Sequence, residues 1–316
     1  MAQRYAILTV LIFCLTFSAA LKAAPPQSES TNFHENGPFK VATVDSLDLA
    51  DAKREKHVTV KVYYPEGDGP FPVIVFSHSL RGNKDRYPEL ARHWTSHGYI
   101  IVHPTHDDTG VEMVNGGMHP PGDKVLDRVR DVTAVLDAFD QLERFPALRG
   151  KLDRNRIGVG GHSYGSFVTM AVGGAIATVG EEHKKLADPR VKCIVPIAMA
   201  GPGEYGLDEE SWKNLTIPTL FIGGTQDLRV GKPDNWRFEG YRLSPAAGNK
   251  YLVVIEGATH GAYGESGPGN DAPRYVKAAA TAFWDACLRG SEKGKAYLSG
   301  DGFRRFAGKA ATISAK

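Results

Sequence analysis

The chain has 316 residues, of which 42% are hydrophobic and 23% are charged, the proportions of an ordinary globular protein. Removing a leader at residues 1–23 would take away Arg4 and Lys22 and leave 36 basic residues against 36 acidic ones. A nearly neutral chain gives no electrostatic reason to expect a nucleic acid or an anionic membrane surface as a partner.

The first residues have the layout of a secretory signal peptide. Arg4 precedes the apolar run YAILTVLIFCLTFSAA, and small residues follow up to Ala23, where we expect cleavage. The run is too short for a membrane span, so we expect a secreted or periplasmic protein with no stable membrane anchor. Residues 24–38 are polar and rich in proline, which predicts a flexible lead-in. Residues 39–316 are then interpreted as a single domain.

Alternating residues at 40–50 and 57–65 predict a pair of strands at a sheet edge. Strands that are apolar at almost every residue are buried on both faces, as in a parallel sheet covered by helices. Six such runs follow, at 72–78, 99–104, 156–161, 191–199, 218–224 and 251–257. Helical periodicity is found at 88–98, 127–145 and 271–290. This order predicts an α/β fold with a mostly parallel sheet of about eight strands.

The segment Gly161-His162-Ser163-Tyr164-Gly165 has the pattern G-x-S-x-G. A predicted strand precedes it and a predicted helix follows it, which is the setting of a sharp turn that projects a nucleophilic serine. Side chains at 161 and 165 would collide with the neighbouring strand and helix. The alternative is a glycine-rich helix start in which the serine is only a cap.

A serine hydroxyl is a weak nucleophile and needs a base. In folds with this turn, the acid and then the histidine follow the serine in the chain. Of the eleven histidines only His183 and His260 follow Ser163. His183 lies in a charged stretch typical of solvated surface, whereas His260 follows an apolar strand on a glycine-flanked loop. We therefore expect His260 to be the base.

The acid must orient the histidine ring and stabilise its protonated form. Asp227 lies directly after a buried strand and is our first candidate. Asp234, in a polar loop further on, and Glu256, at the end of its strand, are the alternatives. An aspartate that only caps a turn is the structural alternative for Asp227.

Two backbone N–H groups are needed to stabilise the developing oxyanion. One is expected from Tyr164, the residue after the nucleophile. The other is expected from the loop after the 72–78 strand, at Leu80 or at Ser79.

With these residues in place the sequence resembles the α/β-hydrolases. More narrowly, it is similar to dienelactone-hydrolase-like esterases and to secreted or type II platelet-activating-factor acetylhydrolases. The similar stretches are 70–108, 127–139, 156–166, 217–227 and 254–263. The resemblance implies an α/β-hydrolase fold and a serine carboxylesterase without a cofactor, in which Ser163 is the nucleophile, Asp227 the acid and His260 the base. Relatives commonly have glycine at the position of Ser79, and the cysteine nucleophile of true dienelactone hydrolases is absent.

Only about twenty residues separate the strand near 197 from the next, which leaves room for a short helix but not for a large cap domain. This predicts an open cleft suited to bulky or polymeric esters. Two segments are expected to line it, 106–124 and 199–212. The candidate cleft residues are Ser79, Met199, Tyr205 and Trp212.

The HPTHDD cluster raises the alternative of a metal site at His103, His106, Asp107 and Asp108. Its spacing is irregular and no second histidine-rich segment completes it, so we expect no metal. Cys193 and Cys287 are expected to be free buried thiols, although an exported pair could form a disulfide. Two functional alternatives are a non-catalytic binding module on the same scaffold and a serine peptidase or amidase.

Overall fold

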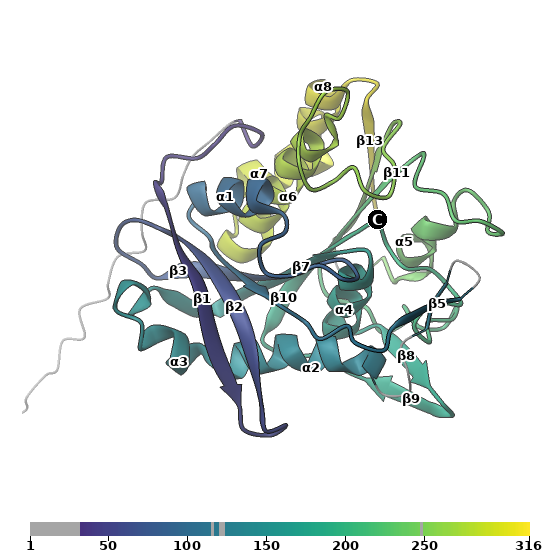
Figure 1. The fold of residues 1–316 in the computed structure, drawn as a ribbon. Coiled ribbons are helices and arrows are strands. Elements are labelled where there is room, and N and C mark those ends of the chain that lie inside the picture. The colour runs from purple at the N-terminus through teal and green to yellow at the C-terminus, as the bar shows by residue number, and fades with distance from the viewer. Residues whose placement is uncertain (1–31, 115–116, 120–123, 247–248) are drawn as a thin grey trace, which may run out of the picture.

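The computed structural model describes residues 32–114, 117–119, 124–246 and 249–316 (Figure 1). Nine strands within these ranges form the main sheet: β1 (Val41–Asp51), β2 (Lys56–Pro65), β3 (Phe71–Ser77), β4 (Ile100–Pro104), β7 (Leu152–His162), β10 (Val191–Ile197), β11 (Thr219–Gly224), β12 (Lys250–Ile255) and β13 (Ala311–Ala315). Their order is β1-β2-β4-β3-β7-β10-β11-β12-β13. The prediction of a mostly parallel sheet is confirmed.

The strand directions separate the centre of the sheet from its edges. β4, β3, β7, β10, β11 and β12 run parallel to one another. β1 and β2 pair antiparallel at one edge, as their alternating sequences predicted, and β13 pairs antiparallel with β12 at the other. The sequence did not predict β13, because five residues near the chain end carry too little periodicity. Two small hairpins, β5 (Glu112–Val114) with β6 (Gly117–His119) and β8 (Ile176–Val179) with β9 (Glu182–Lys185), lie outside the main sheet.

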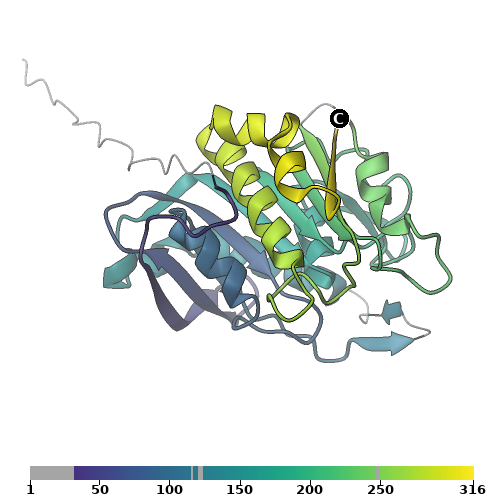
Figure 2. The same cartoon turned by 90° about the horizontal axis from the view of Figure 1, so that it is seen from above.

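Helices cover both faces of this sheet (Figures 1 and 2). One face carries α1 (Pro88–Ser96), α6 (Ala272–Arg289), α7 (Glu292–Ser299) and α8 (Gly302–Ala307); the other carries α2 (Lys124–Asp137), α3 (Phe139–Glu143) and α4 (Tyr164–Gly173). The remaining helical segments are α5 (Glu239–Leu243) and the 3₁₀ turns η1 (Pro146–Leu148) and η2 (Trp236–Phe238). The periodicity at 127–145 predicted one helix, but the chain forms two, because the backbone at Ala138 leaves the helical region.

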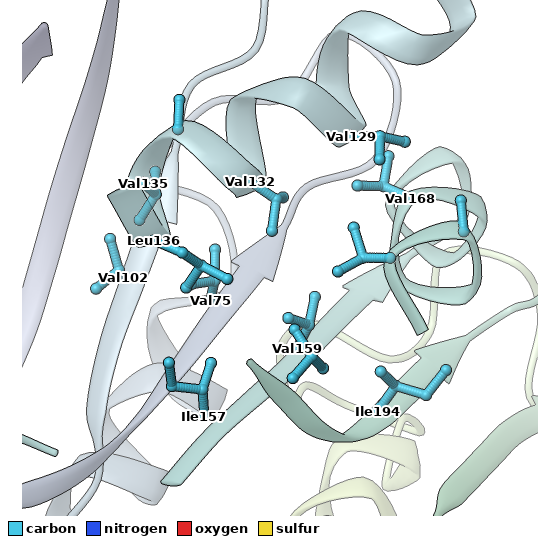
Figure 3. Close-up of a cluster of buried hydrophobic side chains, with 14 of the residues drawn as sticks. Val75, Val102, Val129, Val132, Val135, Leu136, Ile157, Val159, Val168 and Ile194 are labelled. Atoms are coloured by element: carbon cyan, nitrogen blue, oxygen red, sulfur yellow. The ribbon is translucent and has the colours of Figure 1, made fainter. Parts of the chain in front are cut away.

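The two faces of the sheet have separate cores. Alternate strand residues point to opposite faces, so Val75 of β3 packs toward α2 and α4 whereas Phe76 packs toward α1 and α6. Figure 3 shows the first core, in which Val132 of α2 and Val168 of α4 lie over the strands. The second core includes Trp284 of α6, which is fully buried. Burial on both faces explains why the central strands are apolar at almost every position.

Part of the segment predicted as a flexible lead-in is packed against the domain. Phe33 is only 3% exposed, and its ring lies 4.7 Å from that of Tyr297. The backbone oxygen of Phe33 accepts a hydrogen bond from Nε2 of His93 at 3.0 Å, and that of Glu35 accepts one from Nε2 of His97 at 2.8 Å. Residues 32–38 therefore differ from the expected flexible segment, because the buried His93 of α1 and the buried His97 just after α1 hold their backbone. The predicted signal peptide and residues 24–31 lie outside the described residues.

Three further expectations concern the segment between β10 and β11, the two cysteines and the absence of a membrane span. Residues 198–218, between β10 and β11, form turns without the expected short helix, since Gly201, Pro202, Gly203 and Gly206 interrupt any helical run. Cys193 is buried in β10, Cys287 is partly buried in α6, and both thiols are free. None of the helices within the described ranges is long and apolar enough to span a bilayer.

Candidate active site

Ser163 occupies a strained turn between β7 and α4. Its backbone has φ 58° and ψ −115°, a region that residues with a side chain rarely adopt. A Cβ atom on Gly161 would lie 2.4 Å from the oxygen of Gly165, and one on Gly165 would lie 2.1 Å from the oxygen of Ser77. Glycine at both positions therefore lets the turn, the helix and the β3 loop approach one another closely.

His260 and Asp227 reach Ser163 from the loops after β12 and β11. His260 Nε2 lies 2.8 Å from Ser163 Oγ, and His260 Nδ1 lies 2.8 Å from Asp227 Oδ1. The side chain of Asp227 is fully buried, whereas 44% of the His260 side chain is exposed. The three side chains thus form one chain of hydrogen bonds from the buried carboxylate to the serine hydroxyl.

The buried carboxylate of Asp227 has two further partners. Arg237 Nε lies 2.6 Å from Oδ1 and also donates to the Asp227 backbone oxygen at 2.8 Å. The hydroxyl of Tyr263 donates to Oδ2 at 3.2 Å. Burial and the neighbouring Asp227 raise the pKa of Tyr263 well above its usual range, so this hydroxyl keeps its proton. These contacts compensate the charge of a carboxylate that water does not reach.

His162, inside the G-x-S-x-G motif, holds the backbone of His260. Its Nε2 donates to the oxygen of His260 at 2.7 Å, and its Nδ1 accepts from the hydroxyl of Tyr87 at 2.8 Å. Burial, followed by the nearby His260, lowers the pKa of His162 to about 3, so the ring is neutral. The sequence did not predict a role for His162 or Tyr87, although the position of His162 next to the serine was an available signal.

The other candidates for the base and the acid lie elsewhere. His183 is exposed on the β8–β9 hairpin, where its Nδ1 lies 3.1 Å from Thr178 Oγ1. Asp234 and Glu256 are both exposed, and the hydrogen bond of His260 Nδ1 goes to Asp227.

The loop after β3 lies beside the serine. Ser79 and Leu80 line the same pocket as Ser163. Tyr164 is the first residue of α4, where backbone N–H groups have no partner within the helix. Within the described chain the N–H of Leu80 donates no hydrogen bond either. Both N–H groups are therefore available at the serine.

A pocket of about 520 Å³ opens beside Ser163. Its lining residues are Ser79, Leu80, His162, Ser163, Ala198, Ala200, Glu204, Tyr205, Leu228, Arg229, Val230, Arg237, His260 and Gly261. Leu228 is 50% exposed and Val230 is fully exposed, so two apolar side chains face the solvent at this pocket. An ion pair of Arg229 Nη2 and Glu204 Oε1, at 2.8 Å, joins two of the loops that line it.

Two of the four predicted cleft residues do not line this pocket. Ser79 and Tyr205 do, but Met199 and Trp212 are fully buried. The backbone oxygen of Met199 accepts a hydrogen bond from Arg237 Nη1 at 2.8 Å. Trp212 Nε1 donates to the sulfur of Met170 at 3.3 Å. Aromatic and thioether side chains in this turn-rich segment fill the core beneath it. The described residues that line the pocket lie outside the 106–124 segment, which was also expected to contribute.

The side chains of the HPTHDD cluster point in different directions. His103 lies among aromatic rings, His106 bonds Asp131, Asp107 bonds Thr109 and Asp108 bonds Arg128. Within the described ranges no three potential metal ligands come together. His106 and Asp108 instead contact the loop that carries Leu80, at His78 and at the backbone N–H of Arg81.

Comparison with known proteins finds relatives that are named as ester hydrolases. The chain is 24% identical to the cutinase est1 of Thermobifida alba over 75% of this chain and 68% of that protein. It is 23% identical to the cutinase cut1 of Thermobifida fusca, over 80% and 70%. It is 24% identical to a bis(hydroxyethyl) terephthalate hydrolase of Streptomyces coelicolor, over 75% and 65%. A family model described as Chlorophyllase matches residues 29–189.

The mostly parallel sheet flanked by helices has the α/β-hydrolase fold, and the chain is a serine-type carboxylic ester hydrolase. The Chlorophyllase model covers just over half of the 316 residues, and the chain belongs to that family. The match includes Ser163 and the Leu80 loop but ends before Asp227 and His260.

Proposed function

We propose that this ester hydrolase acts through Ser163, His260 and Asp227 and a covalent acyl-enzyme. The observation that carries the proposal is the chain of two 2.8 Å contacts from Asp227 through His260 to Ser163. Such contacts allow the histidine to take the serine proton while the carboxylate stabilises the resulting imidazolium. The strained turn at Ser163 supports the same role, since strain of this kind gathers at functional sites.

The reaction has two halves. Ser163 Oγ attacks the ester carbonyl while His260 Nε2 takes the hydroxyl proton, and the carbonyl oxygen becomes an oxyanion held by the N–H groups of Leu80 and Tyr164. Collapse of this intermediate breaks the ester bond, and His260 gives its proton to the departing alcohol. Water then attacks the acyl-enzyme with His260 as base, which releases the acid and restores Ser163.

The substrates we propose are bulky or polymeric esters. The apolar Leu228 and Val230 at the pocket offer contact area to a large apolar group, and the chain has no cap domain among its described residues. Relatives named cutinases and a relative named for a terephthalate ester support this class.

We also propose that residues 1–23 are a cleaved signal peptide, that residues 39–316 form one domain, and that the enzyme is secreted or periplasmic. The single main sheet from β1 to β13 supports one domain. The narrower similarity to dienelactone hydrolases or platelet-activating-factor acetylhydrolases stays a prediction. N-terminal sequencing of exported protein should give Ala24 as the first residue, and retention of residues 1–23 would contradict the cleavage.

Replacing the nucleophile tests the proposed mechanism. We expect Ser163→Ala to lower kcat on a p-nitrophenyl ester by about a million-fold and to abolish labelling by a fluorophosphonate probe. Ser299→Ala, an exposed position on α7, is the matched control and should behave as the wild type. Comparable turnover by Ser163→Ala would refute the assignment. A wild-type chain that neither labels nor turns over any ester would favour the binding-module alternative.

A further inference from the structure

A buried arginine contacts the loop that carries Leu80. Arg128 of α2 is 1% exposed, and its Nη1 donates to the backbone oxygen of His78 at 2.5 Å. Its Nη2 donates to the backbone oxygen of Ser79 at 3.2 Å. Asp108 completes the set, since Nε donates to its Oδ1 at 2.8 Å and Nη2 to its Oδ2 at 2.5 Å. One planar guanidinium therefore holds two consecutive carbonyls and one carboxylate.

These contacts decide where the N–H of Leu80 points. In a trans peptide the C=O and N–H groups point in opposite directions. The oxygen of Ser79 accepts from the buried Arg128 at 3.2 Å and from His78 Nδ1 at 2.7 Å. It also accepts from the backbone N–H of Gly82 at 3.1 Å, so Arg128 is one of three donors that hold it. The N–H of Leu80, in the same peptide unit, is therefore directed away from the guanidinium, and its residue lines the pocket with Ser163.

The same guanidinium contacts the residue that supplies the other N–H. The Cζ atom of Arg128 lies 4.3 Å from the centre of the Tyr164 ring, a cation–π distance. The helix that starts at Tyr164 is also in close contact with the β3 loop, as the short approach at Gly165 shows. Arg128 thus touches both segments that form the oxyanion site.

We propose that Arg128 is a positioning residue for ester hydrolysis, which fixes the Leu80 N–H in the direction of the oxyanion. The inference rests on the proposed function of Ser163. In this role Arg128 does not contact the substrate, and its effect is on the free energy of the transition state. The negative charge on the carbonyl oxygen develops in the transition state, so an N–H group that points away from this oxygen stabilises the transition state less.

His78 also holds the backbone oxygen of Ser79, and other residues fix the orientation of its ring. Its Nε2 accepts from the backbone N–H of His106 at 3.0 Å, which leaves the proton on Nδ1 to donate to Ser79. Burial, the nearby His106 ring and Arg128 lower the pKa of His78 to about 2, so the ring is neutral. His106 is itself held by Ser77 Oγ and by Asp131, both at 2.9 Å.

Arg128→Lys tests the proposal, because lysine keeps the charge but lacks the planar fork that holds two carbonyls and a carboxylate together. We expect kcat on a p-nitrophenyl ester to fall about 100-fold to 1000-fold, the cost of one oxyanion donor, with KM changed less than threefold. A trifluoromethyl ketone, whose adduct with Ser163 carries an oxyanion, should lose affinity by the same factor as kcat/KM. Arg130→Lys, on the same helix and partly exposed, is the matched control and should leave all three values unchanged.

A folded Arg128→Lys variant whose kcat stays within threefold of the wild type would overturn the proposal. A methyl ketone of the same shape, which forms no adduct with Ser163, reports on substrate binding alone. A rise in KM with an equal loss of affinity for this methyl ketone would also overturn the proposal, because it would show a general distortion of the pocket. If Arg128→Lys does not fold, Asp108→Asn keeps the guanidinium and removes its carboxylate partner. It should lower kcat and ketone affinity together by about tenfold, and unchanged values would overturn the proposal. Wild-type inactivity would instead count against the proposed function itself.

Discussion

The two sides of Ser163 are built in different ways. On the oxyanion side, the Leu80 loop rests on Arg128 and His78, which are 1% and 2% exposed. On the base side, 44% of the His260 side chain is exposed, and its support comes from Asp227 and from one backbone contact with His162. Fixed N–H donors act best when nothing has to reorganise during the reaction. A base must pass protons and admit water, so partial exposure suits it.

Apart from the loss of Ser163 itself, the largest effect is expected where the base loses its acid. Asp227→Asn removes the negative charge that stabilises the protonated ring of His260, although its amide oxygen can still accept from His260 Nδ1 and Arg237 Nε, which both face Oδ1. We expect kcat to fall about 10⁴-fold. Asp234→Asn, in the exposed loop nearby, is the control and should retain wild-type kcat. A fall of less than tenfold for Asp227→Asn would indicate that another carboxylate orients His260.

A smaller effect is expected where the base keeps its acid but loses its backbone support. His162→Phe keeps a ring in the site but removes the hydrogen bond to the His260 oxygen, and we expect kcat/KM to fall up to about 100-fold through misplacement. His162→Gln, which can still donate, should recover part of the loss. Because the pKa of His162 is about 3, the pH profile of either variant between pH 5 and 9 should keep the wild-type shape. A shifted profile would show that His162 titrates during the reaction.

Both sides of the site should lose stability in acid. Burial lowers the pKa of His78 to about 2, of His162 to about 3 and of His103 to about 4, against about 6.5 in the unfolded chain. Between pH 6.5 and pH 4 the unfolded chain therefore binds protons that the folded chain does not. The free energy of unfolding should fall as the pH falls, by up to about 1.4 kcal/mol per pH unit for each histidine.

Urea unfolding at pH 7.5 and at pH 5 measures this dependence. His103→Gln should reduce the difference between the two pH values, because it removes one of the buried histidines whose pKa is lowered. His183→Gln, on the exposed hairpin, is the control and should leave the difference unchanged. Equal stability of the wild type at both pH values would contradict the neutral, buried state of these histidines.

The smallest effect is expected at the solvent-facing edge of the pocket. Leu228→Ser and Val230→Ser remove apolar contact area while leaving Ser163 and its partners in place. KM for a bulky aromatic ester should rise a few-fold, consistent with about 1 kcal/mol of lost burial, whereas p-nitrophenyl acetate should be unaffected. An equal change in KM for both esters would show that these side chains do not contribute specifically to the binding of large substrates.

The strands and the order of the site residues were predictable for a clear reason. Continuous apolar runs such as 72–78 and 251–257 identify buried strands, and the chain order of Ser163, Asp227 and His260 follows the order of those strands. Side-chain direction in turns was not predictable, because it depends on what lies beneath. Trp212 and Met199 therefore looked like cleft residues although both are fully buried.

By itself, the sequence determined the α/β architecture and which serine, aspartate and histidine are candidates, since local periodicity and strand ends carry that information. Only the tertiary structure decided which buried side chains support them. Arg128 and Asp108 are twenty residues apart and both far from Ser163 in the chain, and they meet because α2 packs against β3 and β4. The direction of the Leu80 N–H depends on that packing, because a peptide group is oriented by the atoms that bind its oxygen.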